Sequence, residues 1–513
     1  MNISKYLAIY LALCSSIQLA QVDTLKSAVV KDKRIKISNF PLAFYNFSYT
    51  IVNNFFLVKQ ANEGIPAAQL ELGLRYLEGK GFPNDSIAAI YWITKSAESG
   101  FPYGKYNLAV LQYYGIANLW SPFEAYENFL YAAKRDLPDA CFALGTIFLE
   151  GLLVNQNLEF AHYWLKKSSD LNFDLASKLL KKISESGFKL PKLDLKKNYE
   201  ELSSLNNFTK YNSDQYEKEF KPLIIDFENI DINFEDKKEE MFLKEAAITL
   251  NVVKNIEELD KKIKSDNIVK DNDILLSLFS AARNSIEYYV PEAFLSLGIF
   301  YQKGLYVKKD LKKAFENFLL AYRCGYNKAL IAISNLVSSD EFKKLFDREL
   351  KQQSSFSKLA YSSLMNLNFY QGNLLKNNSN ELLLSIIDEF QALPAFELGS
   401  HLITKNSTEA EKYLYYASQK GNLEALLKLY LIDLLNKKNA DLFLPFEKIE
   451  EYYRKGNATA GLILAYCYEN GIFVENNFGQ AIKIYRSLSS RGIMAAVNSL
   501  ERLYSNERKK YYN

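Results

Sequence analysis

Residue types that commonly do chemistry are scarce in this chain of 513 residues. Its two histidines, His162 and His401, have no cysteine or second histidine at the spacing of a metal site. We therefore interpret both as structural or surface residues. The sequence has no glycine-rich phosphate loop, no Gly-x-Ser-x-Gly elbow and no Cys-x-x-Cys pair. This pattern predicts no catalytic residue, no cofactor and no metal, with a site built from scattered carboxylates as the remaining alternative.

The cysteines do not form a recognisable framework. Cys14 lies in an apolar N-terminal stretch, and the other three are far apart, at Cys141, Cys324 and Cys467. Cys141 and Cys467 fall on predicted helix faces, and Cys324 precedes a glycine at a predicted helix end. We expect these three to be packed thiols and predict no disulfide framework.

Asn-x-Ser/Thr triplets are the other places where chemistry is conceivable, because an exported eukaryotic protein carries glycans on such asparagines. After the first twenty residues, the triplets begin at Asn46, Asn84, Asn207, Asn377, Asn406 and Asn457. Asparagine is abundant here, so chance alone also produces triplets. Asn207 and Asn377 lie in irregular stretches and are the better candidates, Asn46 is a third, and Asn406 also fits a helix cap.

The elements that must position any site are revealed by an internal repeat between residues 67 and 172. Several columns share a step of thirty-six residues, which is the signature of a solenoid. The columns are Ala68, Gly104, Ala140; Leu72, Leu108, Leu144; Gly73, Ala109, Gly145; Gly79, Gly115, Gly151; Ala89, Ala125, Ala161; Trp92, Asn128, Trp164; and Ser96, Ala132, Ser168.

The first half of each repeat is predicted to be a helix with a small-residue face. Ala68, Leu72, Gly73 and Tyr76 share one helical face, where small residues let a second helix approach closely. Gly79 then ends the helix, because glycine adopts the left-handed conformation at little cost.

The second half of each repeat is predicted to be another helix. It begins at residues whose side chains accept hydrogen bonds from free amides, namely Asp85, Ser121 and Asn157. Behind Ser121, Pro122 and Glu124 complete the pattern of a first-turn proline and a capping box. Gly100 closes the helix, so each unit reads helix, turn, helix, turn.

This pattern resembles the Sel1-like repeats, relatives of the tetratricopeptide repeats. The resemblance rests on the Ala-x-x-x-Leu-Gly-x-x-Tyr-x-x-Gly-x-Gly run from Ala68 to Gly81, followed by Trp92, Lys95, Ala97 and Gly100. It implies an all-α, right-handed superhelix of helical hairpins, with structural glycines and no catalysis. Those glycines are Gly73, Gly79, Gly100, Gly115, Gly145, Gly151, Gly298, Gly304, Gly325, Gly471 and Gly492.

The repeats are expected in about three blocks. We predict an N-terminal block at 38–187, beginning with a lone second helix that ends at Gly64, then a middle helical and repeat block at 237–350 and a C-terminal block at 351–505. Residues 188–236 are interpreted as an irregular linker, and 506–513 as a solvated polar tail. The alternation of Ile230, Ile232 and Phe234 with polar residues leaves an extended segment as the alternative within that linker.

Residues 1–20 are predicted to be a signal peptide. Lys5 gives a positive start, the apolar core from Tyr6 to Cys14 is too short to span a bilayer, and Ala20 offers a cleavage point. An N-terminal anchor or a buried helix is the alternative. Leu13 before Cys14 does not fit a bacterial lipid-attachment signal. In the mature chain no apolar run has the length of a transmembrane helix.

Composition and resemblance together predict a scaffold that binds other proteins. A net charge of +3, with 24% charged and 48% hydrophobic residues, suits a folded domain and argues against a nucleic-acid partner. Repeat blocks behind a signal peptide resemble the lumenal adaptor of the endoplasmic-reticulum degradation ubiquitin ligase, which implies a membrane ligase and misfolded clients as partners. The alternative is a bacterial periplasmic or secreted Sel1-like protein acting in envelope assembly or host interaction.

Overall fold

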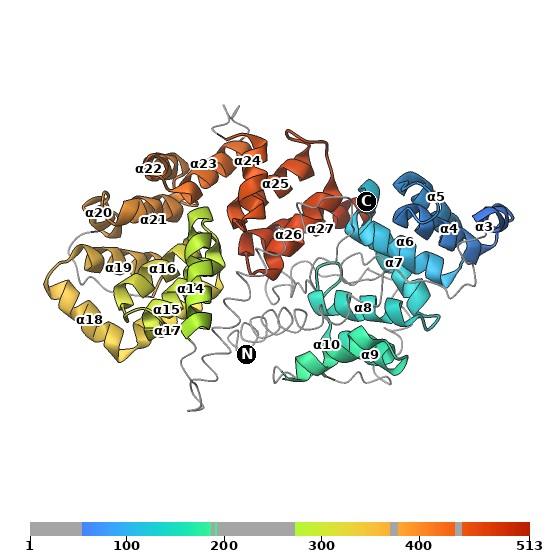
Figure 1. The fold of residues 1–513 in the computed structure, drawn as a ribbon, viewed down its shortest axis with the longest axis horizontal. Helices are drawn as coiled ribbons and strands as arrows, with labels where there is room; N and C mark the ends of the chain where they lie inside the picture. Colours follow the sequence, from blue (N-terminus) through green and yellow to red (C-terminus); the bar gives the residue numbers. More distant parts are fainter. Residues whose placement is uncertain (1–53, 186–189, 192–271, 370–377, 437–443, 513) are drawn as a thin grey trace. The chain divides into compact units, whose positions relative to one another are not determined.

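The computed structural model describes residues 54–185, 190–191, 272–369, 378–436 and 444–512 (Figure 1). Within these ranges the chain forms helices and turns, together with an isolated antiparallel bridge between Tyr326 and Ile493. The predicted all-α solenoid of helical hairpins is confirmed. The chain divides into two compact units, one made of 1–234, 467–491 and 495–513, the other of 235–466 and 492–494.

Unit 1 begins with successive antiparallel helices that pair as hairpins, drawn in blue to green in Figure 1. They are α3 (Asn54–Asn62), α4 (Pro66–Glu78), α5 (Ser86–Glu98), α6 (Pro102–Tyr114), η2 (Ile116–Asn118), α7 (Pro122–Ala133), α8 (Pro138–Glu150), α9 (Leu158–Asp170) and α10 (Asp174–Glu185). The chain returns to this unit near its end, with α26 (Phe478–Ser490) and α27 (Met494–Tyr512).

Unit 2 repeats the hairpin pattern with more irregular connections. Its elements are α14 (Asn272–Ser285), η4 (Ile286–Tyr288), α15 (Pro291–Lys303), α16 (Leu311–Arg323), α17 (Lys328–Ser338), α18 (Asp340–Lys351), α19 (Ser355–Asn366), α20 (Ser379–Leu384), η5 (Phe390–Ala392), α21 (Leu393–Leu402), α22 (Ser407–Gln419), α23 (Leu423–Leu435), α24 (Phe446–Arg454) and α25 (Ala458–Asn470). The boundary between the units falls within α25 at Cys467, and Met494, the first residue of α27, groups with unit 2.

The first helix of a repeat has the same start and end signals each time. A proline in the first turn follows an extended residue, at Pro66, Pro102, Pro138 and Pro291, because its fixed φ suits that position and its missing amide is not needed there. At the other end Gly79 has φ 64°, and its amide bonds the carbonyl of Arg75. Gly115, Gly151 and Gly304 end their helices in the same left-handed conformation.

The small-residue column explains how closely the two helices of a hairpin approach. A Cβ added to Gly73 would lie 2.7 Å from Cγ1 of Ile93 and 3.0 Å from the carbonyl oxygen of Ala89. A Cβ on Gly145 would lie 2.6 Å from Cγ of Leu165. Since real side chains do not tolerate such distances, only glycine fits at these contacts.

The second helices confirm two of the three predicted caps. The Asp85 carboxylate accepts from the amides of Ile87 and Ala88, and the Asn157 side chain caps α9 in the same way. Helix α7 begins after Ser121 with Pro122 in its first turn, as predicted, but the expected capping box is not formed. The Ser121 side chain makes no capping hydrogen bond, and the Glu124 carboxylate instead accepts from Nε2 of Gln112 at 2.7 Å. The carboxylate that a capping box would use is therefore bonded to a side-chain amide on α6.

The last part of the chain differs from the expected polar tail. Helix α27 continues to Tyr512, and Nη2 of Arg508 donates to the carbonyl oxygens of Leu152 at 3.1 Å and Leu153 at 3.3 Å. These carbonyls lie in the turn after α8 and do not take part in helix hydrogen bonds. A guanidinium, which has several N–H donors, can satisfy both of them. Arg508 is therefore a docking residue of unit 1 and not a solvated one.

Several predictions lie outside the described residues and stay predictions. They concern the signal peptide at 1–20, the part of the half-repeat before residue 54, the alternation at 230–234 and the beginning of the middle block, before residue 272. The described end of the half-repeat, α3, packs Leu57 and Ala61 against Ala68 and Leu72, as a second helix of the repeat does.

Candidate functional site

The two histidines belong to different units, His162 to unit 1 and His401 to unit 2. Nδ1 of His162 lies 2.9 Å from the carbonyl oxygen of Pro191. His401, on α21, lies 3.0 Å through Nε2 from Nζ of Lys405, and burial followed by that lysine lowers its pKa. Among the described residues no group of three or more His, Cys, Asp or Glu side chains is arranged to hold a metal ion.

The three cysteines in the described ranges occupy packed positions, as the sequence predicts. Cys141, Cys324 and Cys467 are buried and carry free thiols. Burial raises the pKa of Cys141 and of Cys467 to about 12 each, and that of Cys324 well above its usual value. Thiols with raised pKa values are poor nucleophiles at neutral pH, so these behave as core residues.

The favoured glycan candidates Asn46, Asn207 and Asn377 lie outside the described residues. Two of the other triplets are placed clearly. Asn406 is exposed and caps α22 by accepting from the amide of Glu409. Asn457 is fully buried, and its Nδ2 donates to the carbonyl of Tyr288 at 2.9 Å. A glycan on Asn457 is therefore incompatible with the folded unit 2.

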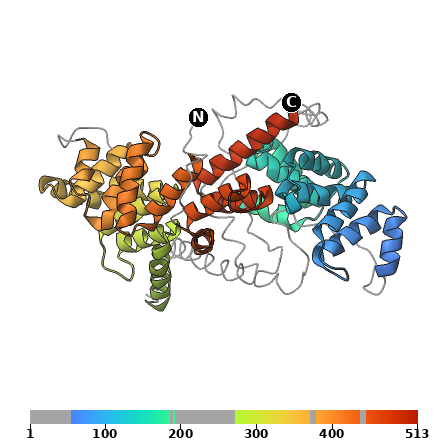
Figure 2. The ribbon, with the colours of Figure 1, turned by 90° about the horizontal axis from the view of Figure 1, so that it is seen from above.

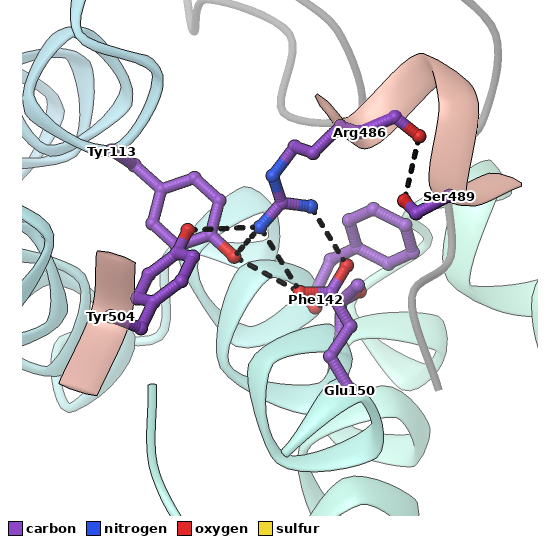
Figure 3. A network of polar contacts seen from close by, with 7 residues as sticks. Tyr113, Phe142, Glu150, Arg486, Ser489 and Tyr504 are labelled. Atoms are coloured by element: carbon purple, nitrogen blue, oxygen red, sulfur yellow. Dashed lines mark hydrogen bonds and ion pairs between the residues drawn. The ribbon is translucent and has the colours of Figure 1, made fainter. Parts of the chain in front are cut away.

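A buried polar network in unit 1 joins helices from both ends of the chain (Figure 3). Nη1 of Arg486, on α26, donates to Oε1 of Glu150 at 3.1 Å, and Nη2 donates to Oε2 at 3.3 Å. Nη2 also donates to the hydroxyls of Tyr113 at 2.5 Å and Tyr504 at 3.1 Å, while the Tyr113 hydroxyl donates to Oε2 of Glu150 at 3.0 Å. Every member of the network thus has a partner within it.

The pKa values of Arg486 and Tyr113 indicate that this network has a structural role. Burial by itself lowers the pKa of Arg486, but Glu150 and the surrounding tyrosines raise it, and the net pKa lies well above its usual value. Burial raises the pKa of Tyr113 well above its ordinary range. Neither Arg486 nor Tyr113 exchanges a proton near neutral pH, so neither of these two side chains is suited to general acid or base catalysis there. It fastens α26 and α27 to α6 and α8.

Sequence reasoning missed this network. Arg486 lies on the otherwise apolar inner face of α26, between buried Tyr485 and Leu488, and such a charge signals a buried partner. The sequence does not say which carboxylate that partner is.

Unit 2 contains a comparable cluster of buried charges. Arg323, on α16, forms a bidentate pair with Glu397 of α21, at 2.6 Å from Nε to Oε2 and 2.5 Å from Nη2 to Oε1. Nζ of Lys428 donates to the Arg323 carbonyl at 2.6 Å, and burial lowers its pKa. Burial raises the pKa of Glu424, which accepts from Thr459 and, at 3.0 Å, from Asn457. These contacts tie α16, α21, α23 and α25 together.

The outer surface of α7 is covered by the C-terminal helix. The Tyr511 ring stacks on Phe123 with centroids 5.2 Å apart, and its hydroxyl donates to Oε1 of Glu127 at 2.5 Å. The Arg508 guanidinium lies 5.9 Å from the centroid of the same Phe123 ring. The views in Figures 1 and 2 agree in placing the end of α27 beside this part of unit 1. Phe123 is only 2% exposed.

Other second helices leave large apolar side chains uncovered. On α5 Ile87 is 79% and Tyr91 53% exposed, and on α3 Phe55 is 75% exposed. Exposed apolar side chains that form a contiguous patch mark surfaces that other proteins contact, whereas single ones are common on folded proteins. No helix in the described ranges combines the length and apolar character needed to cross a bilayer.

Comparison with known proteins identifies the repeats. The Sel1 repeat family profile matches six segments, at 66–101, 102–137, 138–173, 291–326, 395–422 and 462–493. A curated relative, an uncharacterized protein of Neisseria meningitidis serogroup B, is 32% identical over 106 residues. That match covers 20% of this chain and 21% of the relative.

Two solved structures are similar in part. One is c5321, a protective antigen of uropathogenic Escherichia coli strains with an SLR fold, at 18% identity over 89% of this chain and 91% of that one, with a TM-score of 0.29. The other is a Sel1 repeat protein from Oxalobacter formigenes, at 26% identity over 25% of this chain and 97% of that one, with a TM-score of 0.23. The family match and the hairpin geometry agree: six segments of this chain match the Sel1 repeat profile and lie in helical hairpins.

Proposed function

We propose that this chain is a non-catalytic scaffold that binds other proteins through its Sel1 repeats. Proteins with such repeats generally mediate protein–protein interaction, and the fold is typically a scaffold. The observation that carries the proposal is the contrast between interior and surface. Buried charges form ion pairs within each unit, Arg486 with Glu150 and Arg323 with Glu397, whereas large apolar side chains such as Ile87 are left exposed.

Cross-linking with the full chain tests the scaffold. The tagged protein is cross-linked in its own cells, and partners are recovered and quantified against a chain with Arg486→Ala and Arg323→Ala, whose loss of structure is checked by circular dichroism. We expect to recover proteins that are enriched with the folded chain and not with the double variant. Equal recovery by the two chains would remove the proposal, because binding would then not depend on the repeats.

In its more specific form, the scaffold is exported and recognises substrates in endoplasmic-reticulum-associated degradation, together with a membrane ubiquitin ligase. The predicted signal peptide at 1–20 and the resemblance of the repeat blocks support this form. A pull-down of the full chain should recover a ligase subunit, and glycosidase treatment should change the mobility of the chain. A pull-down without any ligase subunit would leave the scaffold but reject this role.

The alternative is a bacterial periplasmic or secreted scaffold in envelope assembly or host interaction. The relative in Neisseria meningitidis, at 32% identity over 106 residues, favours it. Residues 1–20 fused to alkaline phosphatase, which is active only after export, should give activity in a bacterial host. Activity that survives a change of the apolar core to charged residues would contradict export by this signal.

A further inference from the structure

The repeat register singles out two positions on the second helices, two and six residues after the cap. On α7 these are Phe123 and Glu127, and on α5 they are Ile87 and Tyr91, thirty-six residues earlier. At the first of these positions, the other four matched repeats carry Glu159, Lys312, Thr408 and Gly479. Only α7 and α5, of the six, therefore place a large apolar side chain there.

The chain itself shows what covers this position on α7. The end of α27 lies across it, with the Tyr511 ring stacked on Phe123 and the Tyr511 hydroxyl donating to Glu127. The contact combines an aromatic stack with a charge-assisted hydrogen bond one turn further along the helix. It shows that a helix fits across this register of a Sel1 hairpin.

The same positions on α5 are bare. Ile87 is 79% and Tyr91 53% exposed, against 2% for Phe123. Lys95 follows one turn after Tyr91, with Nζ 5.9 Å from the Tyr91 ring centroid, and pairs with Glu98 at 3.0 Å on the surface. Exposed ion pairs of this kind contribute little to stability. The Lys95 ammonium can therefore leave Glu98 and bind a carboxylate of a partner at a small cost in free energy.

The polarity of the second position is reversed between the two helices. Glu127 accepts a hydrogen bond from the covering helix, whereas Tyr91 has a hydroxyl to donate and Lys95 adds a positive charge beyond it. The complementary helix therefore carries an apolar side chain over Ile87 and a carboxylate near Tyr91 and Lys95.

We propose that Ile87, Tyr91 and Lys95, the α5 strip, dock an amphipathic acidic helix of a partner protein in the register that α27 occupies on α7. The inference rests on the proposed scaffold function and names one surface of it. A strip of two helical turns is small, so binding is weak and depends on the acidic side chains for orientation.

Three synthetic 18-residue amphipathic helices test the strip. They share one leucine stripe and differ only in the flanking residues, which are Glu, Gln or Lys. Fluorescence anisotropy with the full chain should show the Glu peptide binding at least tenfold more tightly than the Lys peptide. Equal affinity for the two, or no binding by any of them, overturns the proposal.

Substitutions then locate the binding. Ile87→Ser with Tyr91→Ser should weaken the Glu peptide at least tenfold, and Lys95→Gln should reduce its preference over the Lys peptide. Tyr415→Ser is the matched control, because Tyr415 is also 53% exposed but lies in unit 2. Far-UV circular dichroism confirms folding of each variant. A Glu-peptide affinity unchanged by the double substitution overturns the proposal.

The failure of the strip is distinguishable from the failure of the scaffold. The double variant is also used for partner recovery by cross-linking. If it recovers partners as the unchanged chain does, and the peptide contrast is absent, the strip is rejected while the scaffold stands. If neither chain recovers partners, the scaffold function itself is rejected.

Discussion

Arg486 and Glu150 form a bidentate ion pair across 336 residues of sequence, at 3.1 Å and 3.3 Å. Their side chains are 4% and 2% exposed. A charge buried to this degree is tolerated only with its partner, since an uncompensated ion away from water costs several kcal/mol. The pair therefore fixes α26 against the N-terminal repeats within unit 1.

Breaking this pair should destabilise unit 1 selectively. Arg486→Ala leaves Glu150 buried without its cation, and we expect a loss of about 3–5 kcal/mol in the free energy of unfolding. All three tryptophans of the chain, Trp92, Trp120 and Trp164, lie in unit 1, so tryptophan fluorescence during urea unfolding measures it. The double variant Arg486→Met, Glu150→Leu should recover part of the loss. A single variant as stable as the unchanged chain would contradict the structural role of the pair.

The two cap positions in unit 1 should respond differently to the same substitution. Asp85→Ala removes an acceptor for the amides of Ile87 and Ala88, which should cost about 1 kcal/mol. Ser121→Ala should cost at most a few tenths, because that hydroxyl caps no amide. Both values are measured by tryptophan fluorescence in urea. Equal losses at the two sites would mean that the caps are not distinguished by their side-chain contacts.

Asn457 should be intolerant of change although it resembles the cap at Asn406. Asn457→Asp keeps the oxygen that accepts from Ala460 but loses the donor to Tyr288 and places a second carboxylate against Glu424. We expect unit 2 to lose about 2–4 kcal/mol.

The matched control is Asn406→Asp, which keeps an exposed cap oxygen on α22 and should change stability by less than about 0.5 kcal/mol. Both are followed by circular dichroism in urea, after the tryptophan-reported transition of unit 1 has been assigned. Comparable effects from the two substitutions would show that the buried contacts of Asn457 contribute nothing.

Glu316 should give unit 2 a pH-dependent stability. Burial, and then Asp310, raise the pKa of this carboxyl to about 7 from its ordinary 4.5, while Lys312 and Lys313 act against the rise. The folded state therefore holds this proton more tightly than the unfolded chain. The contribution of this group to the free energy of unfolding is greatest at a pH below 4.5. It falls as the pH rises from about 4.5 to 7, and it is constant at higher pH.

Replacing this group should remove that pH dependence. Glu316→Gln should be more stable than the unchanged chain above pH 7, by about 1–2 kcal/mol once screening by solvent at a partly exposed side chain is counted. Urea unfolding of unit 2 at pH 5 and pH 8 measures the difference. An advantage of the variant that is the same at both values would show that Glu316 does not titrate in this range.

Local patterns in the sequence were sufficient for the hairpins. The glycines at a step of thirty-six end helices because only they reach positive φ cheaply, and Asp85 and Asn157 begin helices because their side chains satisfy nearby amides. Both effects act within one turn, so the repeat reveals them. The capping box expected at Ser121 is absent, and Glu124 instead accepts from Gln112, twelve residues away on another helix.

The sequence by itself determined the repeat, its helical hairpins and the small columns that let them pack, because these depend on residues close together in the chain. Only the tertiary structure decided that Arg486 meets Glu150, that Arg508 and Tyr511 dock on the N-terminal repeats, and that Ile87 stays bare where Phe123 is covered. Those outcomes depend on which surfaces, distant in the sequence, come into contact. The repeats have similar helix faces, so the periodic pattern does not indicate which of these faces another part of the chain contacts.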